Sequence, residues 1–303
     1  MRIGFVTCAD LSRYRVSKQN PLYTHDDQIA ADFLLAQGCD VVPIVWGEPV
    51  EQVKKKNLDV LVVRSPWDYS DSEENRASFL AWLQELNKHS LPLANPFPVL
   101  RWNLDKHYLQ ELENSGVSIP PTILMGPQDT LEVLDDALAK WGKIVVKPCI
   151  SAGARDTFLF DQRDALRMLQ PIRCGRTFMV QPFLPAISDV GEWSLVFLNQ
   201  EYSHAVLKLP KKGHWLVQDE LGGSVQCLEA PNDIREFAQA TFEKAQSLLQ
   251  TKFGSHGHLL YARVDILPGC VLGELELLEP ELFFRDHIGA VQKFHQGLLR
   301  LTK

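Results

Sequence analysis

The sequence predicts an α/β and α+β protein, in which a parallel-sheet α/β unit is followed by a larger mixed region. Three short apolar runs near the start, Arg2–Thr7, 41–45 and 59–63, have the composition of strands, and helical patterns separate them. Strands that alternate with helices at this spacing are typical of a parallel sheet. Prolines at 96 and 98 close a fourth strand, 91–95, so we place a domain boundary after residue 98.

The composition limits the classes of function. The chain has 303 residues, of which 45% are hydrophobic and 23% are charged, and its formal net charge is −7. A negative charge argues against binding to nucleic acid or to an anionic membrane. The N-terminal stretch is too quickly polar for a signal peptide, and six scattered cysteines without metal-binding spacing indicate reduced thiols. We therefore expect a cytoplasmic protein that acts on small molecules.

Beyond residue 98 the periodicity changes repeatedly between helix and strand. We expect helices at 101–115, 130–140, 164–170, 233–250 and Ala290–Leu301. We expect strands at 122–125, 143–148, 157–160, 177–182, 191–197 and 202–209, and a final hairpin at 261–280.

The final hairpin carries acidic residues where an inward-facing strand normally has Val or Ile. Side chains alternate across a strand, so Glu274 and Glu276 share one face while leucines occupy the other. Pro268-Gly269 predicts a turn that brings Asp265 alongside them. Three neighbouring carboxylates repel one another unless a cation neutralises them, and Mg²⁺ takes oxygen ligands. On these residues alone, a solvated acidic face is the alternative.

Two predicted loops carry candidate binding residues. Arg64, Trp67 and Asp68 follow the strand 59–63, at the sheet edge where open α/β sheets bind ligands. Pairing of Arg64 with Asp68, and packing of Trp67 over the core, are the structural alternatives. The segment 151–157 is rich in small residues, which let a backbone curl around an anion. It lacks the Walker A spacing, and a plain turn explains it equally well.

Taken together, these features resemble the ATP-grasp superfamily. The ordered set runs from about residue 95 to 285 and consists of Lys106 within a helix, Lys147 before the small-residue loop, the Gln181-Pro-Phe-Leu hinge, and Asp265 followed by Glu274 and Glu276. The segments that begin at Arg64, Ser151 and Tyr261 are most similar to the cycloserine-biosynthesis cyclo-ligase group, and bacterial glutathione synthetase is a more distant likeness. The resemblance implies a two-subdomain ATP-grasp fold, with subdomains 99–180 and 181–303, after the N-terminal domain 1–98.

The resemblance also implies a ligand for each motif. ATP phosphates would meet Lys106 and Lys147 beneath a cover formed by Ser151, Ala152 and Gly153. Adenine would meet Gln181, Pro182, Phe183 and Leu184, and the ribose hydroxyls would meet Glu192. One or two Mg²⁺ ions would be held by Asp265, Glu274 and Glu276, with Glu279 as a further ligand.

The implied reaction is an ATP- and Mg²⁺-dependent ligation. A small amino-acid-like or peptide carboxylate would become an acyl phosphate, and an amine-type nucleophile would displace the phosphate to form an amide or a ring. We expect catalytic cations from Lys208, Arg263 and Arg155. We expect the acceptor site to include Arg64, Trp67, Asp68 and Arg285. The sequence decides neither the identity of the substrates nor whether the chain forms a homodimer.

One position departs from the family pattern, which has an arginine where this chain has Leu216. Loss of an arginine that stabilises the transferred phosphoryl group slows the reaction by orders of magnitude. Lys208, Lys211, Lys212, His214 or Arg263 could supply the missing charge. The alternative function is an ATP-binding protein with weak or no ligase activity, such as a sensor or partner subunit. A phosphotransferase with a stable phosphorylated product is a third reading.

Overall fold

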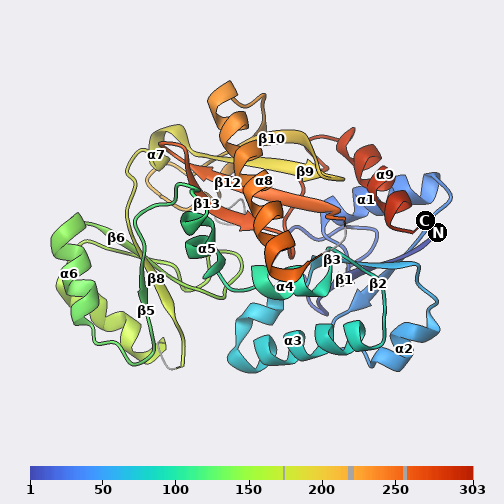
Figure 1. Cartoon of the computed structure of the whole chain (residues 1–303), viewed down its shortest axis with the longest axis horizontal. Helices are drawn as coiled ribbons and strands as arrows, with labels where there is room; N and C mark the ends of the chain where they lie inside the picture. Colours follow the sequence, from blue (N-terminus) through green and yellow to red (C-terminus); the bar gives the residue numbers. More distant parts are fainter. Residues whose placement is uncertain (173–174, 218–221, 255–257, 303) are drawn as a thin grey trace.

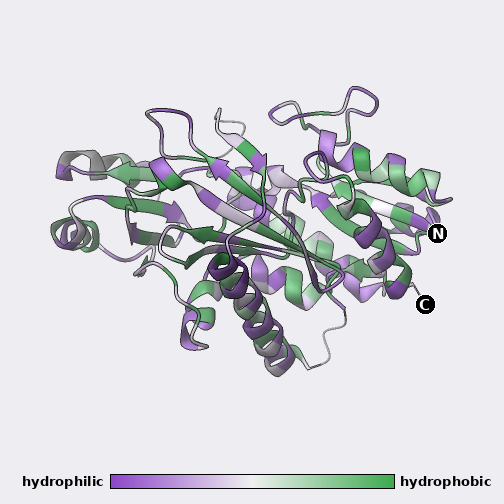
Figure 2. Cartoon of the chain, turned by 90° about the horizontal axis from the view of Figure 1, so that it is seen from above, coloured by the Kyte–Doolittle hydropathy of each residue, from purple (hydrophilic) through white to green (hydrophobic). Residues whose placement is uncertain are grey.

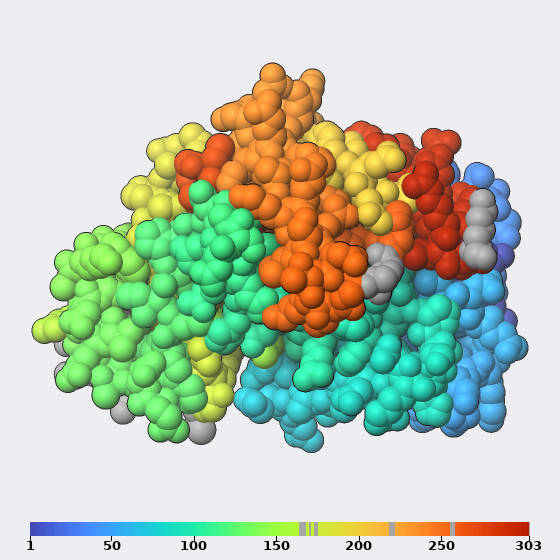
Figure 3. Space-filling view, in the orientation of Figure 1, coloured from blue at the N-terminus to red at the C-terminus, as the bar shows by residue number. Residues whose placement is uncertain are grey.

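Three β-sheets follow one another along the chain in the computed structural model, and each is covered by helices (Figure 1). The structure describes residues 1–172, 175–217, 222–254 and 258–302. The two chain ends lie close together at the end of the molecule that holds the N-terminal domain, and the second sheet forms a lobe at the opposite end (Figures 1 and 3).

The N-terminal domain contains a four-stranded sheet in the order β2-β1-β3-β4, and all its pairings are parallel, as predicted. Its strands are β1 (Arg2–Thr7), β2 (Asp40–Val45), β3 (Val60–Ser65) and β4 (Leu93–Ala94). Its helices are α1 (His25–Ala36), α2 (Val50–Lys55), the 3₁₀ turn η1 (Trp67–Asp71) and α3 (Glu73–Lys88). Every residue of β3 is buried, which explains its unbroken apolar run.

The predicted helix 101–115 is wrong, because two helices replace it. They are α4 (Phe97–Asn103) and α5 (Tyr108–Asn114), and Lys106 lies in the turn between them. The Lys106 backbone N–H donates to the Cys149 carbonyl, 2.9 Å away, which is a contact that no local periodicity encodes. The side chain of Asn103, the last residue of α4, donates to the carbonyl of Leu275 at 2.7 Å.

The second sheet has the order β5-β8-β6-β7 and is antiparallel. Its strands are β5 (Ile123–Met125), β6 (Ile144–Pro148), β7 (Phe158–Phe160) and β8 (Phe178–Pro182). The helix α6 (Glu132–Trp141) and the 3₁₀ segment η2 (Arg163–Ile172) accompany them; an α-helix was predicted for the latter, but Pro171 lies within it. The proposed subdomain boundary at 180/181 falls inside β8.

The third sheet has the order β11-β10-β9-β12-β13. Its strands are β9 (Glu192–Leu198), β10 (Glu201–Leu209), β11 (Ser224–Cys227), β12 (Tyr261–Leu267) and β13 (Val271–Glu276), and α7 (Ile187–Val190) precedes them. The sequence did not predict β11 or α7. The long helix α8 (Asn232–Phe253) packs on β9 and β12, whereas α9 (Ala290–Leu301) packs between this sheet and α1. The predicted hairpin is confirmed, with Asp265 directly opposite Glu274.

The largest hydrophobic core joins the third sheet to α4, α5 and α8, and includes Trp102, Leu109, Phe242 and Leu275. Residues just after the first domain boundary therefore pack with the C-terminal sheet, and Met179 of the second sheet belongs to the same core. Hydrophobic residues concentrate along the strands in the middle of the molecule, and hydrophilic residues lie on the outer helices and loops (Figure 2). Five cysteines are free thiols, and Cys174 lies outside the described residues. Within the described ranges, no helix has the length and apolar character of a membrane span.

Candidate active site

A cavity of about 270 Å³ has walls from all three sheet regions, and most of the predicted site residues line it. They are Trp67, Lys106, Lys147, Ser151, Ala152, Gly153, Gln181, Pro182, Phe183, Leu184, Glu192, Lys208, Arg263, Asp265, Glu274, Glu276 and Glu279. Leu216 also lines the cavity. Residues from distant parts of the sequence therefore meet in one concave space, which is the usual form of a small-molecule site.

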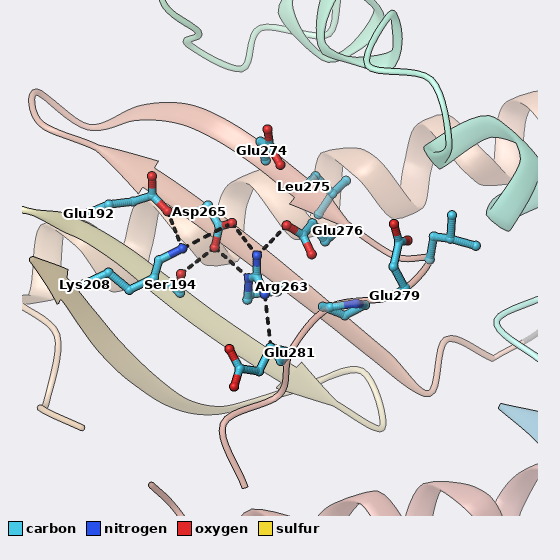
Figure 4. A network of polar contacts seen from close by, with 12 residues as sticks. Glu192, Ser194, Lys208, Arg263, Asp265, Glu274, Leu275, Glu276, Glu279 and Glu281 are labelled. Carbon is cyan, nitrogen blue, oxygen red and sulfur yellow. Dashed lines mark hydrogen bonds and ion pairs between the residues drawn. The ribbon is translucent and has the colours of Figure 1, made fainter. Parts of the chain in front are cut away.

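Three carboxylates gather on β12 and β13 at the floor of this cavity. Ligand oxygens of Asp265, Glu274 and Glu276 all lie within 4.8 Å of one another, and Glu279 lies outside that group (Figure 4). Arg263 donates two hydrogen bonds to Asp265, at 2.9 Å each, and also contacts the Glu276 carboxylate. The antiparallel register explains the meeting, because it places Arg263 opposite Glu276 and Asp265 opposite Glu274.

The charges in this group are incompletely balanced. Burial alone would raise the pKa of Asp265, but Arg263 and Lys208 outweigh burial and lower that pKa to about 2. Burial raises the pKa of Glu276 to about 8, because the attraction of Arg263 is offset by the neighbouring carboxylates. A hard divalent cation among these oxygens would relieve the repulsion, so the donor set fits Mg²⁺.

Four side-chain cations point toward the same group. The Nζ atoms of Lys147 and Lys106 lie 3.3 and 3.8 Å from Glu274 Oε1, and Lys106 also donates to the Ser151 carbonyl at 2.9 Å. Lys208 pairs with Glu192 and lies 3.7 Å from Asp265 (Figure 4). Arg263 is the fourth cation. One turn and three strands thus deliver positive charge to one place, as phosphate binding requires.

The opposite end of the cavity is apolar and lies beside the hinge that follows β8. The Phe183 backbone N–H donates to the Lys143 carbonyl at 2.9 Å, which fixes the hinge to the start of β6. The Trp215 ring packs edge-on against Phe183, with ring centroids 6.2 Å apart. Other apolar residues line this part of the cavity and form an apolar slot with Phe183 and Trp215; they are Val145, Pro182, Leu184, Ile187 and Leu267.

Residues 3–95 match the family model of the N-terminal domain of D-cycloserine synthetase DcsG. Over 269 residues the chain is 30% identical to the cycloserine biosynthesis protein DcsG of Streptomyces lavendulae, which covers 81% of this chain and 84% of that protein. The chain belongs to this family. The crystal structure of D-cycloserine synthetase DcsG matches with a TM-score of 0.81 and 26% identity, over the full length of both chains.

More distant solved structures share the fold. D-alanine–D-alanine ligase from Bacillus anthracis has a TM-score of 0.65 at 15% identity, covering all of this chain and 97% of that one. The ATP-grasp ligase PsnB, with its precursor peptide and a nucleotide analogue, has a TM-score of 0.58 at 15% identity over 100% and 97% of the chains. The predicted ATP-grasp fold is therefore confirmed. The chain is an ATP-dependent carboxylate–amine ligase of the DcsG family.

Two expected substrate residues do not line the cavity of this DcsG-family ligase. Arg64 is 2% exposed and donates to Asp27 at 2.9 Å, so the alternative pairing with Asp68 is wrong. Asp68 instead accepts a hydrogen bond from the Trp46 indole. Arg64 and Asp27 lie 37 residues apart in the sequence, so their pairing depends on the tertiary fold and cannot be predicted from the local sequence.

Two further arginines, Arg155 and Arg285, are not among the residues that line the cavity. Arg155 pairs with Asp71 at 2.6 Å, and Asp71 also pairs with Arg13 at 2.6 Å, so the small-residue loop is tied to the N-terminal domain. Arg285 pairs with Glu281 and lies 3.3 Å from Asp286. Their predicted catalytic and substrate roles therefore have no support in the arrangement of the side chains.

The sequence reasoning missed several lining residues, including Tyr14, Tyr69, Trp215, Glu281 and Phe283. Tyr14 had a usable signal, because it follows β1, and the carboxyl ends of parallel strands share one sheet edge. Phe283 had none: its φ of 54° is unusual for a bulky residue and depends on tertiary contacts.

Proposed function

We propose that the chain uses ATP and Mg²⁺ to activate a small amino-acid-like or peptide carboxylate as an acyl phosphate, which an amine-type nucleophile then attacks, with release of ADP and phosphate. The observation that carries this proposal is the convergence of Lys106 and Lys147 on Glu274, within the cavity that also holds the Asp265 group. Phosphoryl transfer requires carboxylate oxygens that bind a metal ion next to cations that bind phosphate.

Asp265, Glu274 and Glu276 would hold Mg²⁺, which supplies charge neutralisation and orientation of phosphate oxygens. Glu274 has a second role in this scheme. While it pairs with Lys106 and Lys147, it holds both ammonium groups over the cavity floor. When phosphate oxygens replace Glu274 as the partners of Lys106 and Lys147, Glu274 becomes available as a metal ligand.

Lys208 and Arg263 are the cations best placed to stabilise the transferred phosphoryl group. Arg263 is rigidly oriented by Asp265 and by the Phe283 ring, whose centroid lies 5.7 Å from the guanidinium carbon. Because a preoriented cation needs little reorganisation during the reaction, it stabilises developing charge efficiently. Glu192, assigned to the ribose, shares its carboxylate with Lys208.

The adenine ring would lie in the apolar slot between the hinge and Trp215. The rigid hinge backbone offers hydrogen-bonding groups there, while Phe183 and Leu184 offer apolar surface. Gln181 donates to the Thr122 hydroxyl at 2.9 Å, so its side chain positions the hinge from behind.

The test is Asp265→Ala, with Asp40→Ala on the exposed edge of β2 as the matched control. In the native protein, saturating Mg²⁺ with the non-hydrolysable analogue AMPPNP should stabilise the fold by about 3 kcal/mol at 100 times the dissociation constant. Asp265→Ala should lose this increment and at least about 1,000-fold of substrate-dependent ADP release, because the metal neutralises the transferring group. Calorimetry and a coupled ADP assay over a panel of amino acids and dipeptides measure both. Undiminished turnover in Asp265→Ala would contradict the proposal.

The second candidate is a nucleotide-binding protein with little turnover. Leu216 supports it, because it faces the cavity at the position where the family pattern has an arginine. It predicts AMPPNP binding without ADP release across the whole substrate panel.

A further inference from the structure

The strand β13 lies at one edge of the third sheet and carries both glutamates of the candidate metal group. Glu274 and Glu276 stand on either side of Leu275 (Figure 4). On the outer side of an edge strand, no neighbouring strand pairs with the backbone N–H and C=O groups. Leu275 and Leu277 are fully buried, so backbone groups there need partners from elsewhere in the protein.

The side chains of Asn103 and Tyr108 supply those partners. Asn103 Nδ2 donates to the Leu275 carbonyl at 2.7 Å. Asn103 Oδ1 accepts from the backbone N–H groups of Leu277 and Leu278, at 2.6 and 3.1 Å. The Leu275 backbone N–H donates to the Tyr108 hydroxyl oxygen at 3.0 Å. Two side chains thus take the place of a neighbouring strand, beside the residues that flank Glu276.

The Asn103 amide is occupied by these contacts. Its Oδ1 atom has two lone pairs, and both accept a backbone N–H, while Nδ2 uses one of its two N–H groups on Leu275. The side chain is also 8% exposed, although it lines the cavity. Asn103 therefore acts on the strand that carries the glutamates rather than on a ligand.

The segment 103–108 also carries Lys106, which is bonded to the phosphate side of the cavity. The Lys106 backbone N–H donates to the Cys149 carbonyl at 2.9 Å, and its ammonium group donates to the Ser151 carbonyl at 2.9 Å. The same ammonium group lies 3.8 Å from Glu274 Oε1. One short segment is therefore joined to the glutamate strand on one side and to the small-residue loop on the other.

On the basis of the function proposed above, we propose that the segment 103–108 couples metal binding to phosphate binding, with Asn103 and Tyr108 as positioning residues for Glu274 and Glu276. They fix β13 against the segment that carries Lys106, and so set the distance between the carboxylates and the ammonium group. In this scheme neither side chain contacts the metal ion. Residues that orient metal ligands from outside contribute about 10- to 100-fold to metal affinity.

The first test measures Mg²⁺ binding by calorimetry in the presence of saturating AMPPNP. Asn103→Ala should weaken Mg²⁺ binding by about 10- to 100-fold, because it frees the outer side of β13. Tyr108→Phe is a milder variant that removes one hydroxyl from a buried ring, and it should weaken Mg²⁺ binding by about 3- to 10-fold.

Asn95→Gly is the matched control, because Asn95 also makes three hydrogen bonds to this hairpin region. It donates to the Tyr261 and Leu277 carbonyls, at 2.9 and 2.8 Å, and accepts from the Leu260 N–H at 2.8 Å. Its φ of 57° suits glycine, and it lies outside the segment that carries Lys106. Urea denaturation should show similar losses of stability in Asn95→Gly and Asn103→Ala, but Asn95→Gly should keep Mg²⁺ affinity within about threefold.

The second test measures the phosphate side alone, as AMPPNP binding in the presence of EDTA. Asn103→Ala should weaken this binding by about 3- to 10-fold, because a displaced Lys106 makes poorer charge-assisted hydrogen bonds. Asn95→Gly should leave it within about twofold, since Lys106 keeps its position.

Three results would overturn the coupling. The first is Mg²⁺ affinity in Asn103→Ala within about threefold of the native value. The second is an equal loss of Mg²⁺ affinity in Asn95→Gly, which would reduce Asn103 to a general role in stability. The third is an unchanged AMPPNP affinity of Asn103→Ala in EDTA. If Asn103→Ala does not fold, Tyr108→Phe decides by the same criteria.

The native protein separates this proposal from the proposed function. If the native protein fails to bind Mg²⁺ with AMPPNP, the proposed function fails and the coupling falls with it. If the native protein binds both and the variants show no loss, the proposed function survives and the coupling alone is wrong.

Discussion

Two buried arginines, each held between two carboxylates, occupy different places in this molecule. Arg64 lies between Asp27, at 2.9 Å, and Asp26, at 3.7 Å, and all three side chains are at most 3% exposed. Arg263 lies between Asp265 and Glu276, where the cavity opens. The residue types are the same, but the surroundings differ.

The Arg64 network consists of Arg64, Asp26 and Asp27. We call it closed because its members also form hydrogen bonds with backbone groups. Asp26 accepts from the backbone N–H groups of Leu282 and Arg285, at 3.3 and 3.1 Å, and Arg64 donates to the Pro280 carbonyl. These bonds join α1 and β3 to the segment that follows β13. Arg263 also donates to one backbone carbonyl, that of Glu281, but its network extends through Asp265 to Lys208, which lines the cavity. A closed charge network holds structure together, whereas an open one has capacity left for a ligand.

Removing Arg64 should produce the largest loss of stability. Arg64→Met leaves two buried carboxylates without their cation, which costs about 3–5 kcal/mol of unfolding free energy. Urea denaturation measures it. The matched control is Arg2→Met, which breaks an exposed pair with Asp40 and should cost under about 1 kcal/mol. Equal effects of the two substitutions would show that the closed network contributes no more than a surface pair.

His204 contacts the same segment after β13, so the pH dependence of stability gives a second test of this region. Its Nε2 atom lies 3.0 Å from the Leu282 carbonyl oxygen, and its ring stacks on His287 with centroids 4.8 Å apart. Burial, and then the neighbouring His287, lowers the pKa of His204 from 6.5 to about 4. The unfolded chain therefore binds a proton as the pH falls below about 6.5, while the folded chain resists it.

Stability should consequently decline between pH 7 and pH 5, by about 2 kcal/mol from this group alone. His204→Gln keeps a side-chain N–H donor for Leu282 but does not titrate. Urea denaturation at both pH values should show a shallower decline in the variant than in the native chain. Parallel declines would exclude His204 as the source.

The sequence was sufficient for features that depend on neighbouring residues. Alternation in the final hairpin placed Glu274 and Glu276 on one face, and the turn at Pro268-Gly269 brought Asp265 opposite Glu274. Strand alternation with helices predicted the parallel sheet for the same reason. Local periodicity and turn chemistry are properties of short segments.

The errors concern partners that are distant in the sequence. Arg64 was expected at the acceptor site because it follows the strand 59–63, and pairing with Asp68 was the structural alternative, whereas its carboxylates lie 37 and 38 residues earlier on α1. Lys106 was predicted to lie within one helix, because the local sequence does not show that its backbone N–H donates a hydrogen bond to the Cys149 carbonyl. In both cases, the choice between structural and functional roles is made by tertiary contacts.

The smallest effect should come from adding a cation to the open network. Leu216→Arg places a guanidinium in the cavity that Lys208 and Arg263 already supply with positive charge. Because those two cations are buried and held by carboxylates, we expect kcat for ADP release to change by less than about tenfold, or about 1.4 kcal/mol in activation free energy. Leu216→Met, similar in volume and neutral, is the matched control. A rise of 100-fold or more in Leu216→Arg alone would show that the native open network lacks a necessary charge, and would favour the nucleotide-binding protein with little turnover.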